Sequence, residues 1–217
     1  MPAKAITVLI SGRGSNLAAL LSAMREGALD GAITHVVADR PDAGGLAIAR
    51  KHDVATTVVD HRAYSSRADF NAALAKTIDR VAPDLVVLAG FMRVVGADVV
   101  ARYTGRIINV HPSLLPLYPG LDTHRRALAD GVRIHGCSVH FVTRAIDAGP
   151  LIAQGAVPVL DDDDETSLAA RVLAVEHRLL PTVVGWFCTD RLALVDARVR
   201  LKGATKCDTR SLLVPAA

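Results

Sequence analysis

The chain has 217 residues, of which 51% are hydrophobic and only 4% are aromatic. Its net charge of +3 comes from 25 basic and 22 acidic residues that form no basic stripe with interleaved aromatics, so nucleic acid is not expected as a partner. The first apolar run, Ala5 to Ile10, is too short for a signal-peptide core or a membrane span. The three cysteines lack C-x-x-C spacing, which indicates reduced thiols and a cytoplasmic protein.

Short apolar segments alternate with helical patterns in the first half of the chain. This alternation is typical of β-α-β units and predicts a mostly parallel sheet. The strands are expected at 6–11, 34–39, 56–60, 84–90 and 106–111, and the helices at 15–27, 44–52, 68–82 and 96–103.

The pattern changes after a proline-rich stretch. Segments 136–142 and 151–160 are expected to pair as antiparallel strands, because only a short segment joins them. A long helix is expected at 166–187, bent or interrupted at Pro181, and a late edge strand at 192–201. The tail from Lys202 has no strong pattern. The whole predicts an α/β fold with a Rossmann-like, mostly parallel sheet, helices on both faces and antiparallel strands in the C-terminal part.

Ligands of such sheets bind at the carboxyl ends of the strands, where the first candidate motif, SGRGSN, lies at 11–16. Its glycines and the free N–H groups of the next helix suit a phosphate. A dinucleotide site is an alternative, because Asp39 resembles a ribose-binding acid, but Leu17 stands where that fingerprint needs a small residue. An ordinary tight turn is the third interpretation. We favour the phosphate, and a monophosphate suits the short loop.

The second candidate motif is NVHPSLLP, which begins at Asn109. Asn109 and His111 stand two apart at a strand end and therefore point to the same face. An amide and an imidazolium side by side can stabilise an oxyanion, and the imidazolium can protonate a leaving amine. The preceding segment 89–95, AGFMRVV, suggests packing more than a ligand cradle when taken alone.

A metal site is the alternative to this chemistry. His111, His124, His135, His140 and Cys137 fall within one stretch, but their spacings fit neither H-E-x-x-H nor a zinc ribbon. No metal is therefore expected, and the three later histidines are interpreted as structural.

Two acidic features remain. Asp147 lies in a turn of small residues, where it either caps its own backbone or orients His111; spacing alone does not decide between the two. The run from Asp161 to Glu165 invites a magnesium site, but acids just ahead of a long helix complement its positive end. We favour the helix-capping interpretation for this run.

Together these motifs carry a family resemblance. The segments ISGRGSN, LAGFMRV, INVHPSLLPLYPGLDTH, GCSVHFVTRAIDAGP and VEHRLLP occur in the order and spacing of glycinamide ribonucleotide formyltransferases, over roughly the first 190 residues. Asn-x-His with Ser-Leu-Leu-Pro is similar to folate-dependent formyltransferases in general, whereas the Tyr-Pro-Gly-Leu-x-Thr-His segment resembles the purine enzyme in particular. The resemblance implies one formyltransferase domain, 1–217, with a nucleotide-binding half at about 1–108, a catalytic and folate-binding half at about 109–190 and an uncertain tail.

Such enzymes transfer a formyl group from the co-substrate 10-formyltetrahydrofolate to the amine of glycinamide ribonucleotide in purine biosynthesis. The resemblance implies that Asn109 and protonated His111 meet a tetrahedral oxyanion, and that Asp147 keeps His111 charged. It also implies small-molecule partners only, without membrane or nucleic acid, in a monomer or homodimer.

The resemblance further assigns the substrate contacts. The nucleotide phosphate would be held by Gly14, Ser15 and Asn16, and its ribose side by Glu176. The implied folate contacts are Arg67, Met92, Arg93, Val94, Val95, Asn109, Thr143, Arg144, Ala145, Ile146 and Asp147.

Two positions depart from the family pattern, and both add positive charge. Arg13 stands where asparagine or a smaller residue is often found, and Arg144 replaces an acid. Three alternatives to the implied function remain open: an NAD(P)-dependent Rossmann dehydrogenase, another folate-dependent formyltransferase or hydrolase, and a non-catalytic binding module. The dehydrogenase leaves Asn109 and His111 without a purpose, and the binding module does not require Asp147 beside them.

Overall fold

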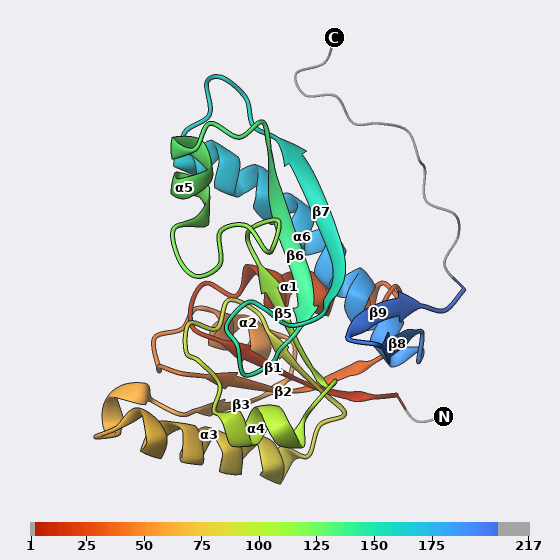
Figure 1. Cartoon of the computed structure of the whole chain (residues 1–217). Coiled ribbons are helices and arrows are strands. Elements are labelled where there is room, and N and C mark those ends of the chain that lie inside the picture. Colours follow the sequence, from red (N-terminus) through yellow and green to blue (C-terminus); the bar gives the residue numbers. More distant parts are fainter. Residues whose placement is uncertain (1–2, 204–217) are drawn as a thin grey trace.

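The computed structural model describes residues 3–203 and contains a seven-stranded sheet in the order β3-β2-β1-β4-β5-β6-β7 (Figure 1). The first five strands along the chain are parallel, whereas β6 and β7 run antiparallel to their neighbours. The strands are β1 (Ala5–Ile10), β2 (Ala32–Ala38), β3 (Ala55–Val58), β4 (Leu85–Leu88), β5 (Ile107–His111), β6 (Ile134–Phe141) and β7 (Leu151–Pro158).

Helices cover both faces of the sheet, as the sequence predicts (Figure 1). They are α1 (Ser15–Arg25), α2 (Gly45–Lys51), α3 (Arg67–Val81), α4 (Ala97–Arg102), α5 (Thr123–Ala129), α6 (Glu165–Cys188) and the 3₁₀ helix η1 (His61–Ala63). One core layer joins the sheet to α1, α2 and α6, and a second joins it to α3 and α4.

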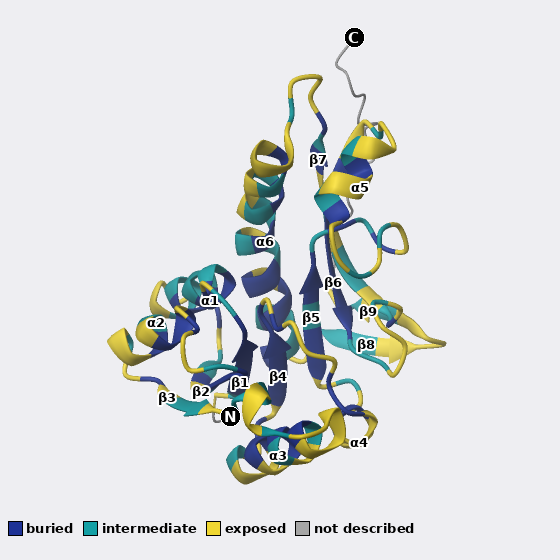
Figure 2. Ribbon diagram, turned by 90° about the vertical axis from the view of Figure 1, so that its left-hand side faces the viewer, coloured by how far each residue is buried: buried dark blue, intermediate teal, exposed yellow. Residues whose placement is uncertain are grey.

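Strand β1 shows why the parallel strands are apolar throughout. Val8 packs in the first core layer and Leu9 in the second, because successive side chains point to opposite faces and both faces are covered. Figure 2 shows these central strands buried and the outer helix surfaces exposed. The predicted fold class is therefore confirmed.

Two predicted elements differ in detail from the structure. Helix α6 runs as one helix from Glu165 to Cys188 with Pro181 inside it, so the helix is not interrupted there, and the alternative of a bend stays a prediction. Leu180, Pro181 and Val183 are buried, so the packing of this turn outweighs the cost of the missing N–H donor. Segment 192–201 is not one edge strand but a hairpin of β8 (Leu192–Val195) and β9 (Arg198–Leu201), a separate two-stranded sheet.

The hairpin turn explains the second correction. Asp196 and Ala197 both have positive φ angles, 49° and 59°. Two such residues between the strands match a tight hairpin turn and reverse the chain within the predicted strand.

The cysteines and the ends of the chain add little to the site. Cys137 and Cys188 are free and buried, in line with the reduced thiols expected. Cys207 and most of the tail without a strong pattern lie outside the described residues. Among residues 3–203, no helix is long and apolar enough to cross a membrane.

Candidate active site at the carboxyl edge of the sheet

The carboxyl ends of β1, β2, β4 and β5 lie at one edge, because these strands are parallel. The loops that follow β1 and β4 are joined there: the Ser11 amide donates to the Gly90 carbonyl oxygen at 3.2 Å, and the Met92 amide donates to Ser11 Oγ at 2.8 Å. The chain winds outward in opposite directions from β1 and β4, which is where open α/β sheets form a ligand crevice.

Asn109 and His111 lie on the same face of β5, as predicted. Asn109 Nδ2 is 3.1 Å from His140 Nε2, and His111 Nε2 is 2.9 Å from the Tyr118 carbonyl oxygen. His140 stands directly opposite Asn109 in the β5–β6 register. The amide and the imidazole therefore have fixed neighbours on the next strand and on the proline-rich loop.

Asp147 lies beside His111, although it is far away in the sequence. Its Oδ2 is 3.4 Å from His111 Nδ1 and accepts a hydrogen bond from the Gly120 amide at 2.9 Å. The loop after β6 folds back along β5 to bring it there. Gly149 permits this fold, because a Cβ at that position would lie 1.8 Å from the Phe141 carbonyl oxygen.

The hydrogen-bond partners of the two histidines differ in kind. Both ring nitrogens of His111 face oxygen acceptors, an arrangement that the doubly protonated imidazolium satisfies. Burial lowers the pKa of His140, so its ring is neutral near pH 7. Its Nδ1 lies 3.0 Å from the Phe141 carbonyl oxygen and carries the proton, which leaves Nε2 to accept from Asn109. His140 thus fixes the direction of the Asn109 amide.

The phosphate-loop candidates meet Glu176 of α6. Gly14 is the N-cap of α1, no side chain caps this helix, and Asn16 Nδ2 donates to Glu176 Oε2 at 2.8 Å. Burial raises the pKa of the Glu176 carboxyl group. Asn16 Oδ1 is buried without a hydrogen-bond partner among the described residues. The four predicted nucleotide contacts therefore lie together at one helix end with free N–H groups.

Gly14 also has a structural task, because it has a φ of +81° and a Cβ there would lie 2.5 Å from Gly45 Cα. We expect Gly14→Ala to lower the free energy of unfolding by about 1–3 kcal/mol, since the αL conformation and the contact both oppose a side chain. Urea denaturation measures this change. Gly12→Ala is the control, because no atom lies within 4 Å of its Cβ position, and equal stability losses in the two variants would contradict the packing role.

Four of the predicted folate contacts line one pocket of about 370 Å³, namely Arg67, Met92, Arg93 and Val94. The side chain of Val95 instead packs in the core layer under α3 and α4. Thr143 donates to the Ala145 carbonyl oxygen at 3.3 Å, and Arg144, Ala145 and Ile146 are exposed on the same loop as Asp147.

His124 and His135 stack edge to face, with ring centroids 5.2 Å apart, and Tyr118 packs against His135 at 5.8 Å. Both imidazoles have lowered pKa values because they are buried, and the pKa of His135 falls to about 4. His124 and His135 do not belong to a metal site, because residues 3–203 contain no group of three or more His, Cys, Asp or Glu side chains that could hold a metal ion. The structural interpretation of these two histidines fits their surroundings.

These lowered pKa values predict acid sensitivity. Between about pH 6.5 and 4, His135 binds a proton in the unfolded chain but stays neutral in the folded protein. The free energy of unfolding therefore decreases as the pH is lowered through this range, by on the order of 2–3 kcal/mol. The stabilisation is fully present above about pH 6.5. Urea titrations at several pH values should show a shallower decline for His135→Gln than for wild type. A similar decline in both proteins, with His52→Gln as control, would contradict this assignment.

The acidic run from Asp161 to Glu165 leads into α6, which begins at Glu165, and Asp164 caps the helix, as favoured. Asp164 accepts from the Ser167 amide at 2.7 Å in a capping box, and Asp163 pairs with Arg171 at 2.7 Å. These contacts occupy two of the carboxylates that a magnesium site would need.

An edge that combines free helix N–H groups with an amide, an imidazole and a carboxylate suits an α/β enzyme that acts on a phosphorylated substrate. Residues 4–184 match the model of the formyl transferase family. The chain is 46% identical to Escherichia coli phosphoribosylglycinamide formyltransferase, over 91% of this chain and 93% of that one. This chain therefore belongs to the formyl transferase family.

Solved structures agree with this assignment. Glycinamide ribonucleotide transformylase 1 from Symbiobacterium toebii is 46% identical, with a TM-score of 0.89 over 92% of this chain and 94% of that chain. Phosphoribosylglycinamide formyltransferase from Coxiella burnetii is 47% identical, with a TM-score of 0.87 over 93% and 94% of the two chains.

Proposed function

We propose that this chain transfers the formyl group of 10-formyltetrahydrofolate to the amine of glycinamide ribonucleotide, giving formylglycinamide ribonucleotide and tetrahydrofolate in purine biosynthesis. The observation that carries the proposal is the meeting of Asn109, His111 and Asp147 beside the phosphate-loop edge. The chain's similarity to enzymes named for this reaction supports it.

In the proposed reaction the substrate amine attacks the formyl carbon, and the carbonyl oxygen becomes an oxyanion. His140 uses one N–H of the Asn109 amide, so the second N–H is free to donate to this oxyanion. The imidazolium form of His111, whose Nδ1 lies 3.4 Å from Asp147 Oδ2, stabilises the same oxygen. As the bond from carbon to the folate nitrogen breaks, the attacking amine loses a proton and the leaving nitrogen gains one.

His111 has to change partner for this role. Its Nε2 faces the Tyr118 carbonyl oxygen at 2.9 Å, while its Nδ1 faces Asp147. A substrate oxygen that accepts from Nε2 takes the place of this carbonyl, so the proline-rich loop has to shift locally when substrate binds.

The substrates are placed by the same geometry. The amides at Gly14, Ser15 and Asn16 suit the nucleotide phosphate, with Glu176 near the ribose. The pocket with Arg67 and Arg93 suits the folate, whose acidic end finds two guanidinium groups there. Of the other implied folate contacts, Thr143 to Asp147 lie on the Asp147 loop, where Arg144 adds a further exposed positive charge. Asn109 lies on β5, and the side chain of Val95 packs in the core.

The direct test is formyl transfer by the purified chain, followed as release of tetrahydrofolate in the presence of both substrates. Transfer that requires the nucleotide supports the proposal. Formate release without nucleotide would indicate the hydrolase alternative, and binding without turnover would indicate a binding module. Reduction of NAD(P) would favour a dehydrogenase, although Asp39, its best sequence signal, is buried against Arg93.

We expect the reaction to be metal-independent, because the proposed oxyanion contacts are an amide and an imidazolium. Dialysis against EDTA should leave formyl transfer within about twofold of the untreated enzyme. Activity that is lost on dialysis and restored by zinc or magnesium would contradict this mechanism.

The setting of the protein is also proposed. Small-molecule substrates, without nucleic acid or membrane, suit a cytoplasmic enzyme that acts as a monomer or homodimer. Size-exclusion chromatography with light scattering distinguishes the two oligomeric states.

A further inference from the structure

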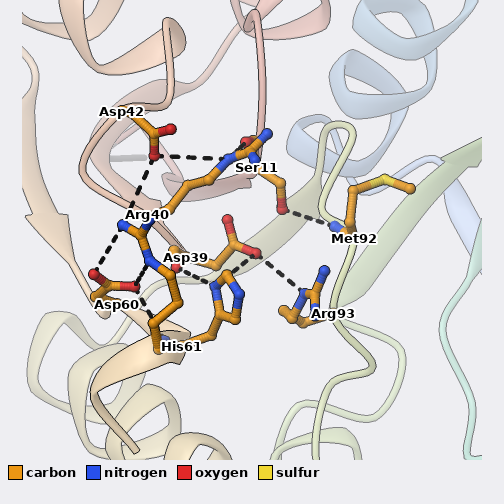
Figure 3. Close-up of polar contacts among 9 residues, drawn as sticks. Ser11, Asp39, Arg40, Asp42, Asp60, His61, Met92 and Arg93 are labelled. Carbon is orange, nitrogen blue, oxygen red and sulfur yellow. Dashed lines mark hydrogen bonds and ion pairs between the residues drawn. The ribbon is translucent and has the colours of Figure 1, made fainter.

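Asp39 is a buried carboxylate that the proposed mechanism does not use. It follows β2, and its side chain is only 1% exposed. Its Oδ2 lies 3.3 Å from Arg93 Nε and 3.8 Å from His61 Nδ1, while its backbone oxygen lies 2.8 Å from the same His61 nitrogen. Figure 3 shows these groups converging from three different loops. The carboxylate is therefore enclosed and not available to a ribose.

The arrangement fastens the loop after β4 at two successive residues. Ser11, at the end of β1, accepts from the Met92 amide, and Asp39, at the end of β2, pairs with the Arg93 side chain (Figure 3). The first contact holds the backbone and the second holds a guanidinium. Two neighbouring strands thus fix where this loop presents its charge.

Arg93 lines the pocket of about 370 Å³ together with Arg67 and His61. The ion pair with Asp39 runs through Nε, at 3.3 Å, and among residues 3–203 the side chain of Arg93 donates no hydrogen bond from its two terminal nitrogens. A guanidinium that pairs through Nε still has its two terminal nitrogens, Nη1 and Nη2, available to donate two parallel hydrogen bonds to a carboxylate. The pocket therefore offers a fixed fork to an anionic ligand group.

The ion pair is poorly explained by stability alone. Arg93 is 43% exposed, and Asp39 Oδ1 is buried without a hydrogen-bond partner among the described residues. An exposed cation contributes little to stability, whereas an unsatisfied buried oxygen is costly. A functional reason accounts better for a carboxylate at this position.

We propose that Asp39 is a positioning residue that orients Arg93 toward the carboxylates at the glutamate end of the folate substrate. This inference rests on the proposed function and adds a residue to it. Asp39 touches no substrate; it acts through the guanidinium. It sets how the enzyme distinguishes a folate with its acidic tail from the same pterin without one.

The test compares two formyl donors, 10-formyltetrahydrofolate and 10-formyltetrahydropteroate, which lacks the glutamate. In Asp39→Asn the KM for the first donor should rise about 10-fold, the loss expected when one charge-assisted hydrogen bond is misaligned. The KM for the second donor, the nucleotide KM and kcat should stay within about twofold. Loss of the negative charge alone would tighten binding of an anion, so a raised KM reports orientation.

Arg93→Lys tests the same geometry from the exposed side, where the core is not disturbed. Lysine keeps the charge but has no Nε to pair with Asp39, and it should lose the same preference for the glutamate-bearing donor. Adding Asp39→Asn to Arg93→Lys should have no further effect, because a residue that acts through Arg93 has nothing left to position. Asp42→Asn, an exposed acid of the same cluster, is the matched control.

The outcomes separate the inference from the proposed function. Wild-type transfer with equal effects of Asp39→Asn on both donors, or tighter binding of the glutamate-bearing donor, would overturn the positioning role and leave the function intact. Additive losses in the double variant would also overturn it. A wild-type chain that transfers no formyl group from either donor would overturn both.

Discussion

Replacing Asn109 with leucine should lower kcat by about 10²- to 10³-fold, the effect of removing one oxyanion donor from an active site. Leucine is similar in size to asparagine but donates no hydrogen bond. The loss should appear mainly in kcat, because the proposed contact strengthens as the oxyanion forms, while the folate KM should rise by less, since Asn109 is also an implied folate contact. Single-turnover formyl transfer at saturating substrate concentrations measures it.

Two controls make this result specific to the amide. The same change at Asn71, on α3 and outside the proposed site, should leave kcat within about twofold of wild type. His140→Phe, which removes the acceptor that directs the Asn109 amide, should produce part of the loss. Near-normal turnover by Asn109→Leu would contradict the role of Asn109 as an oxyanion donor and leave His111 as the remaining proposed oxyanion partner.

The parts of the site that sequence alone predicts are those set by local spacing. Asn109 and His111 share a face because a strand repeats every two residues, and the free amides from Gly14 onward follow from a glycine turn before a helix. The parallel sheet then brings these loops to one edge. None of these steps depends on the path of a long connection.

Contacts across the sheet could not be read in this way. His140 faces Asn109 only because β5 and β6 pair in one particular register, and Asp147 reaches His111 because its loop folds back along β5. Both depend on chain paths that spacing does not encode. The sequence offered one signal for His140: it is a histidine in the strand predicted to follow the one that carries Asn109 and His111.

Asp39 illustrates a different limit. A carboxylate after the second strand matches part of the dinucleotide fingerprint, but the pattern does not indicate which residues contact that carboxylate. In the structure the side chain is enclosed by Arg93 and His61, which come from loops distant in sequence. Helix α6 and the β8–β9 hairpin show the same limit. Burial around Pro181 keeps the helix continuous where a bend or an interruption was expected, and two positive φ angles divide the expected single strand.

Asp147→Asn should fold and bind nucleotide nearly normally, yet lose about 10²- to 10⁴-fold in kcat, the range for a disabled acid-base or oxyanion group. Asparagine keeps the size, tolerates the φ of 50° at this position and can still accept from the Gly120 amide. It lacks the charge that stands 3.4 Å from His111 Nδ1 and stabilises the imidazolium. Single-turnover transfer and NMR detection of the His111 ring protons measure the two consequences.

Asp122→Asn is the matched control for this change. Asp122 also has a positive φ, 57°, and also lies in a loop near the site, but its carboxylate pairs with the exposed Arg125. The identical substitution there should leave kcat within about twofold, because no catalytic histidine depends on that charge. Equal turnover in the two variants, with His111 still protonated in both, would reduce Asp147 to a turn residue. The Asn109 and His111 pair would then act without a carboxylate, and the hydrogen bond from His111 Nε2 to the Tyr118 carbonyl oxygen would become the main constraint on the ring.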